Sequence, residues 1–164
     1  MNSLLFHTTI LPIRHKLYRF ALRITGRPHD AEDVVQEVME KVWKTSQVQT
    51  EQVQNWEAWC MVLTRNRSLD KNKSVQARRF DPLDQVNDLH GHHDNPAQEM
   101  EFKDLARMIR HYMQQLPEKQ RLVMHLRDVE ELSYEEIAAT LDISIDQVKI
   151  NLHRARKTIR AKMS

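Results

Sequence analysis

The stretch Leu132–Met163, LSYEEIAATLDISIDQVKINLHRARKTIRAKM, decides the fold, because it predicts two helices joined by a short turn. Ser133 and Glu136 have the spacing of a capping box, in which a hydroxyl and a carboxylate each accept a hydrogen bond from an unpaired N–H group at a helix start. Ser144 and Gln147 repeat this pattern after a short break. We therefore expect one helix to begin after Ser133 and a second to begin after Ser144.

The second of these helices has an apolar stripe and a strongly basic face. Its apolar residues recur at intervals of three or four, which places them on one side: Val148, Leu152, Ala155 and Ile159. From Gln147 onward the helix carries no Asp or Glu and six cations: Lys149, Arg154, Arg156, Lys157, Arg160 and Lys162. Charge alone would also fit a solvated face whose cations favour the helix dipole. Two caps, a short turn and a basic second helix together predict a DNA-binding helix-turn-helix.

The composition predicts an all-α protein. Only 2 of the 164 residues are glycine, which leaves few of the positive-φ positions that β-hairpin turns require. The chain contains no run of about 18 apolar residues, and its first residues lack the pattern of a signal peptide. We therefore expect a cytoplasmic protein without membrane insertion. The single Cys60 lies among apolar residues and is expected to be buried and structural.

The charge pattern divides the chain into three parts. Residues 1–80 contain 13 Lys or Arg against 8 Asp or Glu, residues 81–104 contain 1 against 7, and residues 105–164 contain 11 against 8. The segment 81–97 also has prolines, a glycine and little periodicity, as is typical of a flexible linker. The sequence thus predicts two small helical domains, 1–80 and 98–164, joined by a flexible acidic linker, with the helix-turn-helix in the second.

Further helices are expected in both domains. Hydrophobic periodicity and capping residues predict helices over about 12–26, 30–44 and 56–73, with a loop at 45–55. In the second domain they predict a helix over 98–116 and another that begins at Pro117. Cations and amides beside Trp56 and Trp59 fit a surface that binds single-stranded DNA, although tryptophans at helical spacing are more often core residues.

The sequence offers no catalytic constellation. It contains no pairing of nucleophile and base, no Gly-rich phosphate loop and no HExxH motif, so we predict neither an enzyme nor a cofactor. Adjacent carboxylates such as Glu130 and Glu131 would diverge on a helix. A histidine cluster in the linker could bind a metal weakly, but no further ligand pair completes a site, so no functional metal is expected: His90, His92, His93 and Asp94.

Taken together, three stretches resemble the extracytoplasmic-function (ECF) sigma factors, which direct bacterial RNA polymerase to promoters. They are LYRFALRITGRPHDAEDVVQEVMEKVW at Leu17–Trp43, the NWEAW and TRNRSLD segments that follow, and LPEKQRLVMHLRDVEELSYEEIAATLDISIDQVKINLHRARKTIR at Leu116–Arg160. The resemblance covers nearly the whole chain apart from the linker. It implies that core RNA polymerase and promoter DNA are partners, and that an anti-sigma factor controls the protein.

The resemblance assigns two surfaces to the first domain. One would bind core RNA polymerase through Asp33, Gln36, Glu37 and Glu40, an acidic and amide strip suited to a basic partner. The other, formed by the loop Ser46–Asn55 and the helix after it, would recognise and melt the minus-ten promoter element. Its candidate residues are Asn55, Trp56, Arg65, Asn66, Arg67 and Lys71.

The resemblance assigns the minus-thirty-five promoter element to the second domain. Bases would be read by Lys149, Ile150, His153 and Arg154, with Gln147, Arg156 and Lys157 available to phosphates. Two residues depart from the family pattern. Asp142 stands where the family usually has Gly, and Asp tolerates the positive φ of such a turn. Ile150 is unusual at a base-reading position and could contact a thymine methyl group.

A second function also fits the helix-turn-helix. The chain could be a dimeric transcriptional regulator that binds operators without contacting core polymerase. That hypothesis gives no role to the strip around Gln36 and Glu37. Comigration with core polymerase distinguishes the two.

Overall fold

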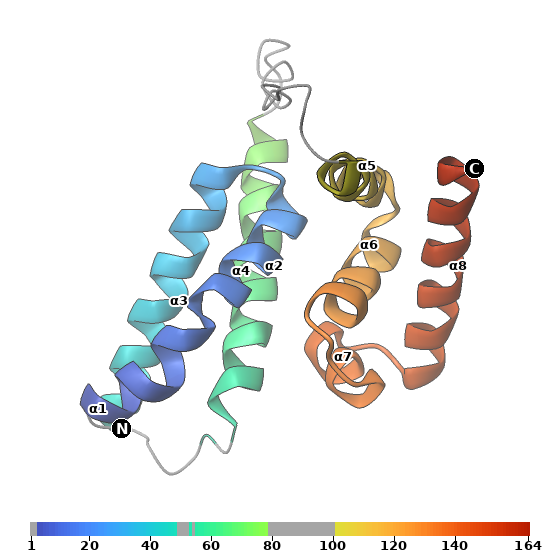
Figure 1. Ribbon diagram of the computed structural model, residues 1–164. Helices are drawn as coiled ribbons and strands as arrows, with labels where there is room; N and C mark the ends of the chain where they lie inside the picture. Colours follow the sequence, from blue (N-terminus) through green and yellow to red (C-terminus); the bar gives the residue numbers. More distant parts are fainter. Residues whose placement is uncertain (1–2, 49–52, 54, 79–100) are drawn as a thin grey trace.

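The computed structural model describes residues 3–48, 53, 55–78 and 101–164, and every regular element among them is a helix. The first domain contains α1 (Ser3–Leu5), η1 (Phe6–Ile10), η2 (Leu11–Ile13), α2 (Arg14–Thr25), α3 (Pro28–Val48) and α4 (Trp56–Ala77). The second contains α5 (Glu101–Gln115), α6 (Glu118–Met124), η4 (His125–Val129), α7 (Tyr134–Leu141) and α8 (Ile145–Met163). Figure 1 shows these two groups of helices next to each other. The expected all-α fold with two domains is confirmed, while the linker lies outside the described residues.

The first domain is a bundle of α2, α3 and α4. Its core residues include Leu17 and Phe20 of α2, Val34 and Val38 of α3, and Cys60 of α4, all fully buried. Burial raises the pKa of the Cys60 thiol to about 12, so this cysteine is a packing residue, as expected.

Local signals in the sequence placed several helix ends of the first domain correctly. Gly26 ends α2 with φ 73°, and its N–H donates to the carbonyl of Leu22 at 2.7 Å. Asn55 caps α4, where its side chain accepts a hydrogen bond from the N–H of Ala58 at 3.0 Å.

Two boundaries in the first domain differ from the sequence prediction. The chain is already helical from Ser3, and Ile10 is fully buried ahead of the α-helix that begins at Arg14. The loop predicted from residue 45 begins later, because α3 continues to Val48. Ser46 is buried in that last turn, and its hydroxyl donates to the carbonyl of Trp43 at 2.7 Å. Because a serine can satisfy its hydroxyl within a helix, the polarity of this residue does not mark the start of a loop.

The helix-turn-helix forms as its sequence predicts. Both capping boxes are present, at Ser133 with Glu136 and at Ser144 with Gln147. Asp142 ends α7 with φ 56°, the left-handed conformation that the turn requires. The stripe of α8 is buried: Val148, Leu152, Ala155 and Ile159.

The helix predicted to begin at Pro117 does not remain an α-helix. It changes at His125 to a single π-helical turn, η4, in which the N–H of Glu130 donates to the carbonyl of His125. Glu131 then takes φ 60°, so Glu130 and Glu131 do not lie on a regular helix as expected.

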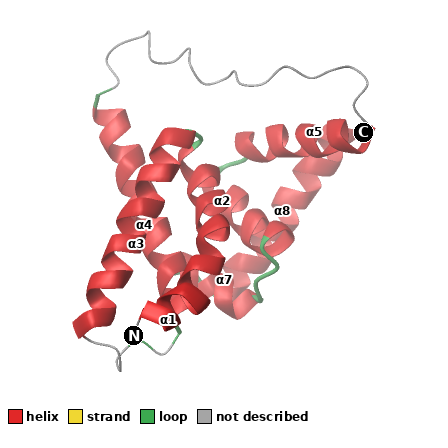
Figure 2. Ribbon diagram, turned by 60° about the vertical axis from the view of Figure 1, so that its left-hand side comes forward, coloured by secondary structure: helices red, strands yellow, loops and turns green. Residues whose placement is uncertain are grey.

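The two domains pack directly against each other. Helix α2 contacts α6 and η4, and α4 contacts α7, so the hydrophobic core continues from one domain into the other. The view in Figure 2 shows α2 and α7 at this junction. Within the described parts of the chain, no helix combines the length and the apolar character needed to cross a membrane.

Candidate nucleic-acid interface

The predicted base-reading face of α8 is open in the structure. Six of the seven residues proposed there are exposed, and they lie opposite the buried stripe: Gln147, Lys149, Ile150, His153, Arg154 and Lys157. The Ile150 residue is 47% exposed and sets an apolar patch among the cations. The helix therefore presents hydrogen-bond donors and one methyl-rich side chain together, the combination that reads base edges in a major groove.

Arg156 differs from its neighbours because its guanidinium is bound within the domain. Its Nε donates to Oδ2 of Asp128 at 3.1 Å and its Nη2 donates to Oδ1 at 2.5 Å. These hydrogen bonds raise the pKa of Arg156 and tie α8 to η4. A phosphate bound by Arg156 would compete with this carboxylate.

The strip predicted to bind polymerase and part of the minus-ten surface lie side by side. Gln36 and Glu40 are exposed on α3. Lys71 Nζ lies 3.9 Å from Asp33 Oδ2 and 3.6 Å from Glu37 Oε1. Arg67 Nη1 lies 4.0 Å from Glu37 Oε2. Exposed pairs of this kind contribute about 0–1 kcal/mol, so these side chains can exchange partners at little cost.

The remaining minus-ten candidates follow α4 from its first turn. Asn55 is exposed at the cap, and Asn66 is exposed further along, where its Oδ1 accepts a hydrogen bond from Arg65 at 3.1 Å. Trp56 and Trp59 form an edge-to-face pair with ring centroids 5.4 Å apart. Both rings are only partly buried, so they pack against the core and keep some surface for a base.

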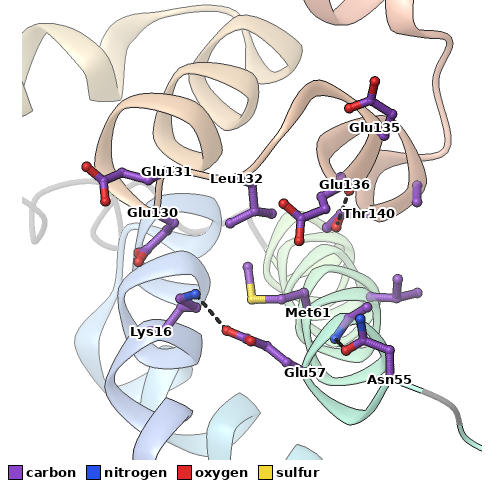
Figure 3. Close-up of a pocket in the computed structure, with 13 residues that line it drawn as sticks. Lys16, Asn55, Glu57, Met61, Glu130, Glu131, Leu132, Glu135, Glu136 and Thr140 are labelled. Carbon is purple, nitrogen blue, oxygen red and sulfur yellow. Dashed lines mark hydrogen bonds and ion pairs between the residues drawn. The ribbon is translucent and has the colours of Figure 1, made fainter.

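A cavity of about 390 Å³ lies where α4 meets the second domain. Figure 3 shows Met61 of α4 and Leu132 on its two sides, and Lys16 paired with Glu57 at 2.7 Å. Five carboxylates line it against the single cation Lys16: Glu57, Glu130, Glu131, Glu135 and Glu136. The cavity is thus shared by both domains, and its charged side chains are mainly acidic.

Sequence reasoning missed a polar cluster between the domains. His125 Nε2 lies 2.9 Å from Oε2 of Glu130, and both side chains are 1% exposed. Arg19 donates two hydrogen bonds to the Glu130 carboxylate, at 2.7 and 3.0 Å. Arg23 Nε donates to His125 Nδ1 at 3.2 Å, and the ring of Phe20 stacks on His125. We term Arg19, Arg23, His125 and Glu130 the interdomain cluster.

The pKa values of the buried pair reflect these contacts. Burial by itself would raise the pKa of Glu130, but hydrogen bonds from His125 and Arg19 outweigh it and lower the pKa to about 2. Burial lowers the pKa of His125, against the hydrogen bond to Glu130 that raises it. The pair is therefore an ionised carboxylate beside a neutral imidazole at neutral pH.

Neither pattern nor spacing revealed this cluster. On a regular helix, residues five apart such as His125 and Glu130 lie on different faces, and only the π-helical turn brings them together. Within the described residues, no group of His, Cys, Asp and Glu is arranged to hold a metal ion, and the linker histidines lie outside those residues.

Two protein families match this chain, one in each domain. Residues 11–79 match the family described as Sigma-70 region 2, and residues 106–159 match the family described as Sigma-70, region 4. The fold and these matches define a transcription initiation factor of the sigma-70 type, a class of DNA-binding proteins.

The chain belongs to the ECF RNA polymerase sigma factors. It is 30% identical over 145 residues to SigL of Mycobacterium tuberculosis, across 88% of this chain and 80% of SigL. It is 34% identical over 146 residues to SigE of Mycolicibacterium smegmatis, across 88% of this chain. The chain spans 56% of the length of that SigE.

Solved structures share the fold. The sigma factor RpoE, in complex with the anti-sigma factor NepR from Bartonella quintana, matches with a TM-score of 0.76 and 22% identity, over 95% of this chain and 94% of RpoE. CnrH, in complex with the cytosolic domain of CnrY, matches with a TM-score of 0.66 and 21% identity, over 99% of this chain and 89% of CnrH. Both matches extend over the two domains.

Proposed function

We propose that this protein binds core RNA polymerase in the cytoplasm, directs it to a set of promoters, and performs no catalysis itself. Residues 1–80 would bind polymerase and the minus-ten element, residues 98–164 would bind the minus-thirty-five element, and residues 81–97 would link them. The observation that carries the proposal is the occurrence of both sigma-70 regions, in order, on two helical domains of one chain. A helix-turn-helix domain alone would fit the dimeric regulator equally well. Because residues 11–79 also match Sigma-70 region 2, that alternative is not favoured.

The second domain would bind the minus-thirty-five element through α8. Lys149, His153 and Arg154 can donate to base edges, and Ile150 can contact a thymine methyl group. Gln147 and Lys157 lie at the margins of that face and would bind phosphates.

The first domain would bind polymerase through the strip on α3 and the minus-ten element through α4. Gln36 and Glu40 are exposed, while Asp33 and Glu37 share cations of α4. Docking of a basic helix on the strip would free Arg67 and Lys71 for a DNA backbone. In this way polymerase binding would strengthen minus-ten binding, because it removes the carboxylates that compete for the same cations.

An anti-sigma factor is the further partner that we propose. This chain shares the fold of RpoE and of CnrH. RpoE was solved with the anti-sigma factor NepR, and CnrH was solved with the cytosolic domain of CnrY. Sequestration of both domains by such a partner would keep the chain from polymerase until a signal releases it.

The polymerase strip can be tested with one matched pair of variants. Gln36→Lys places a cation at the centre of the strip, whereas Gln76→Lys places one at an exposed site near the end of α4. We expect Gln36→Lys to abolish comigration with core polymerase in gel filtration, because a cation there repels a basic partner, and Gln76→Lys to comigrate like the parent protein. Equal comigration of both variants would refute the assignment of the strip.

A further inference from the structure

We propose that the interdomain cluster is an autoinhibitory contact: it holds the two domains together, and in this closed form the second domain opposes DNA binding at the first turns of α4. The inference rests on the proposed function, since it assumes that α4 binds the minus-ten element. It concerns the free protein, before polymerase or a promoter is bound.

The cluster joins the two domains through side chains that could each be hydrated if the domains separated. Arg19 and Arg23 lie one helical turn apart on α2, and both point at the second domain. The Arg19 side chain is 49% exposed, while the Glu130 side chain is 1% exposed. A buried ion pair exchanges the solvation of its partners for their mutual attraction, and the net gain is small. A contact of this kind suits an equilibrium between closed and open forms.

The backbone around Glu130 is shaped for this contact. The chain forms the π-helical turn η4, and Glu131 then takes φ 60°, a region that residues other than glycine rarely adopt. The N–H of Leu132 donates to the carbonyl of Leu126 at 2.9 Å and closes the turn. Uncommon backbone conformations persist where the surrounding contacts fix them, and they concentrate at functional sites. Here the conformation directs Glu130 into the interface.

The closed form places carboxylates beside the first turns of α4. The shared cavity is lined by Asn55 at the cap of α4, by Ala58 and Val62 of α4, and by residues of α7 and the turn before it. Figure 3 shows Glu136 and Thr140 across the cavity from Asn55. Glu131, Glu135 and Glu136 of the second domain are exposed at this site, so in the closed form they would repel DNA phosphates that approached Asn55.

The face of α8 stays exposed in the same closed form. The contact should therefore reduce binding of the minus-ten element and leave binding of the minus-thirty-five element unchanged. This difference separates autoinhibition from a general loss of DNA binding.

The closed form should also depend on pH. His125 Nδ1 accepts a hydrogen bond from Arg23, and that contact needs a neutral ring, whereas the Nε2–H group can donate to Glu130 whether or not the ring is protonated. Protonation of Nδ1 would place a second N–H group of the ring against the Arg23 guanidinium, and this hydrogen bond would be lost. The other charges near the ring are those of Arg19 on α2 and, near Arg23, those of Arg121 on α6 and Arg110 on α5. The open form takes up the proton more readily, so closure weakens as the pH falls below about 6.5.

Small-angle scattering of the full chain tests the closed form. Arg19→Ala removes both hydrogen bonds to Glu130 from a half-exposed position, so the domains should stay folded; Arg14→Ala, at an exposed site on the same helix, is the matched control. We expect Arg19→Ala to raise the radius of gyration and Arg14→Ala to match the parent protein. Glu130→Gln, with folding checked by circular dichroism, should open the chain as well. A compact Arg19→Ala and a compact, folded Glu130→Gln would refute the closed form.

DNA binding tests whether closure inhibits. The probes are a single-stranded oligonucleotide that spans the minus-ten element and a duplex that spans the minus-thirty-five element, both from a promoter mapped with core polymerase. We expect Arg19→Ala to bind the oligonucleotide at least about fivefold more tightly and the duplex equally. An opened variant without this gain would overturn autoinhibition. Failure of the parent protein to give any mapped start site would instead overturn the proposed function.

The pH arm uses the same scattering measurement. The parent protein should open between about pH 7.5 and about pH 5.5, and His125→Gln should lose that dependence because an amide side chain does not titrate in this range. A His125→Gln protein that still opened on acidification would show that another group drives the change and would contradict the role of His125.

Discussion

The exposed face of α8 and the outer face of α4 are both proposed to contact DNA, yet their side chains are engaged very differently. On α8, six candidate residues are exposed on a helix whose start is fixed by a capping box. On α4, Arg67 and Lys71 lie within 4.0 Å of carboxylates of α3. The first turns of α4 also border an acidic cavity. We infer that α8 is ready to bind a duplex, whereas α4 becomes available only after other contacts change.

The largest expected effect tests whether the buried apolar stripe holds α8 in place. Leu152→Ala should lower the free energy of unfolding by about 2–5 kcal/mol, because Leu152 is 3% exposed beneath the face of α8. Ile150→Ala, on the opposite face of the same helix, should change it by less than about 0.5 kcal/mol. Urea unfolding measures both values. Similar values for the two variants would mean that α8 is not held by its apolar stripe.

A smaller effect separates base contacts from general attraction. Arg154→Ala should weaken binding to the minus-thirty-five duplex by about 1–3 kcal/mol and relax the base preference at one position, since an exposed Arg at the centre of this face can bind a guanine. Lys162→Ala removes an exposed cation near the end of α8 and is the control. Binding is measured by fluorescence anisotropy at fixed salt. If Arg154→Ala weakened all sequences equally, its contact would be to phosphate alone.

The smallest effect concerns the cations of α4 that pair with carboxylates of α3. Lys71→Ala should change the free energy of unfolding by no more than about 1 kcal/mol, because its pairs with Asp33 and Glu37 are exposed and long. It should nevertheless weaken binding of the minus-ten oligonucleotide and reduce the salt dependence of that binding by about one unit of slope. Thermal unfolding and salt titrations measure the two effects. A large loss of stability would show that Lys71 is structural.

Local features of the fold were predictable, because each depends on a few neighbouring residues. Both capping boxes and the cap at Asn55 follow from side chains that satisfy their own turn, and the positive φ of Gly26 and Asp142 occurs at residue types that tolerate this conformation. The buried stripe of α8 follows from its periodicity. These features together fix the helix-turn-helix and, with it, the exposure of the candidate residues on α8.

Features that depend on distant parts of the chain were not predictable. The link between Arg19 and Glu130 joins residues 111 positions apart, and it needs the π-helical turn η4 to direct Glu130 inward. The pairing of Lys71 with Glu37 likewise appears only when α3 and α4 pack together. The roles of the polymerase strip and of the two DNA surfaces remain predictions, because an exposed side chain shows which groups it can bind and does not identify its partner.

Transcription in vitro by core RNA polymerase on fragmented genomic DNA, with and without this protein, tests the central claim most directly. We expect a limited set of discrete start sites that appear only when the protein is present, each preceded by two shared sequence elements at a constant separation. The same start sites with and without the protein would contradict the account.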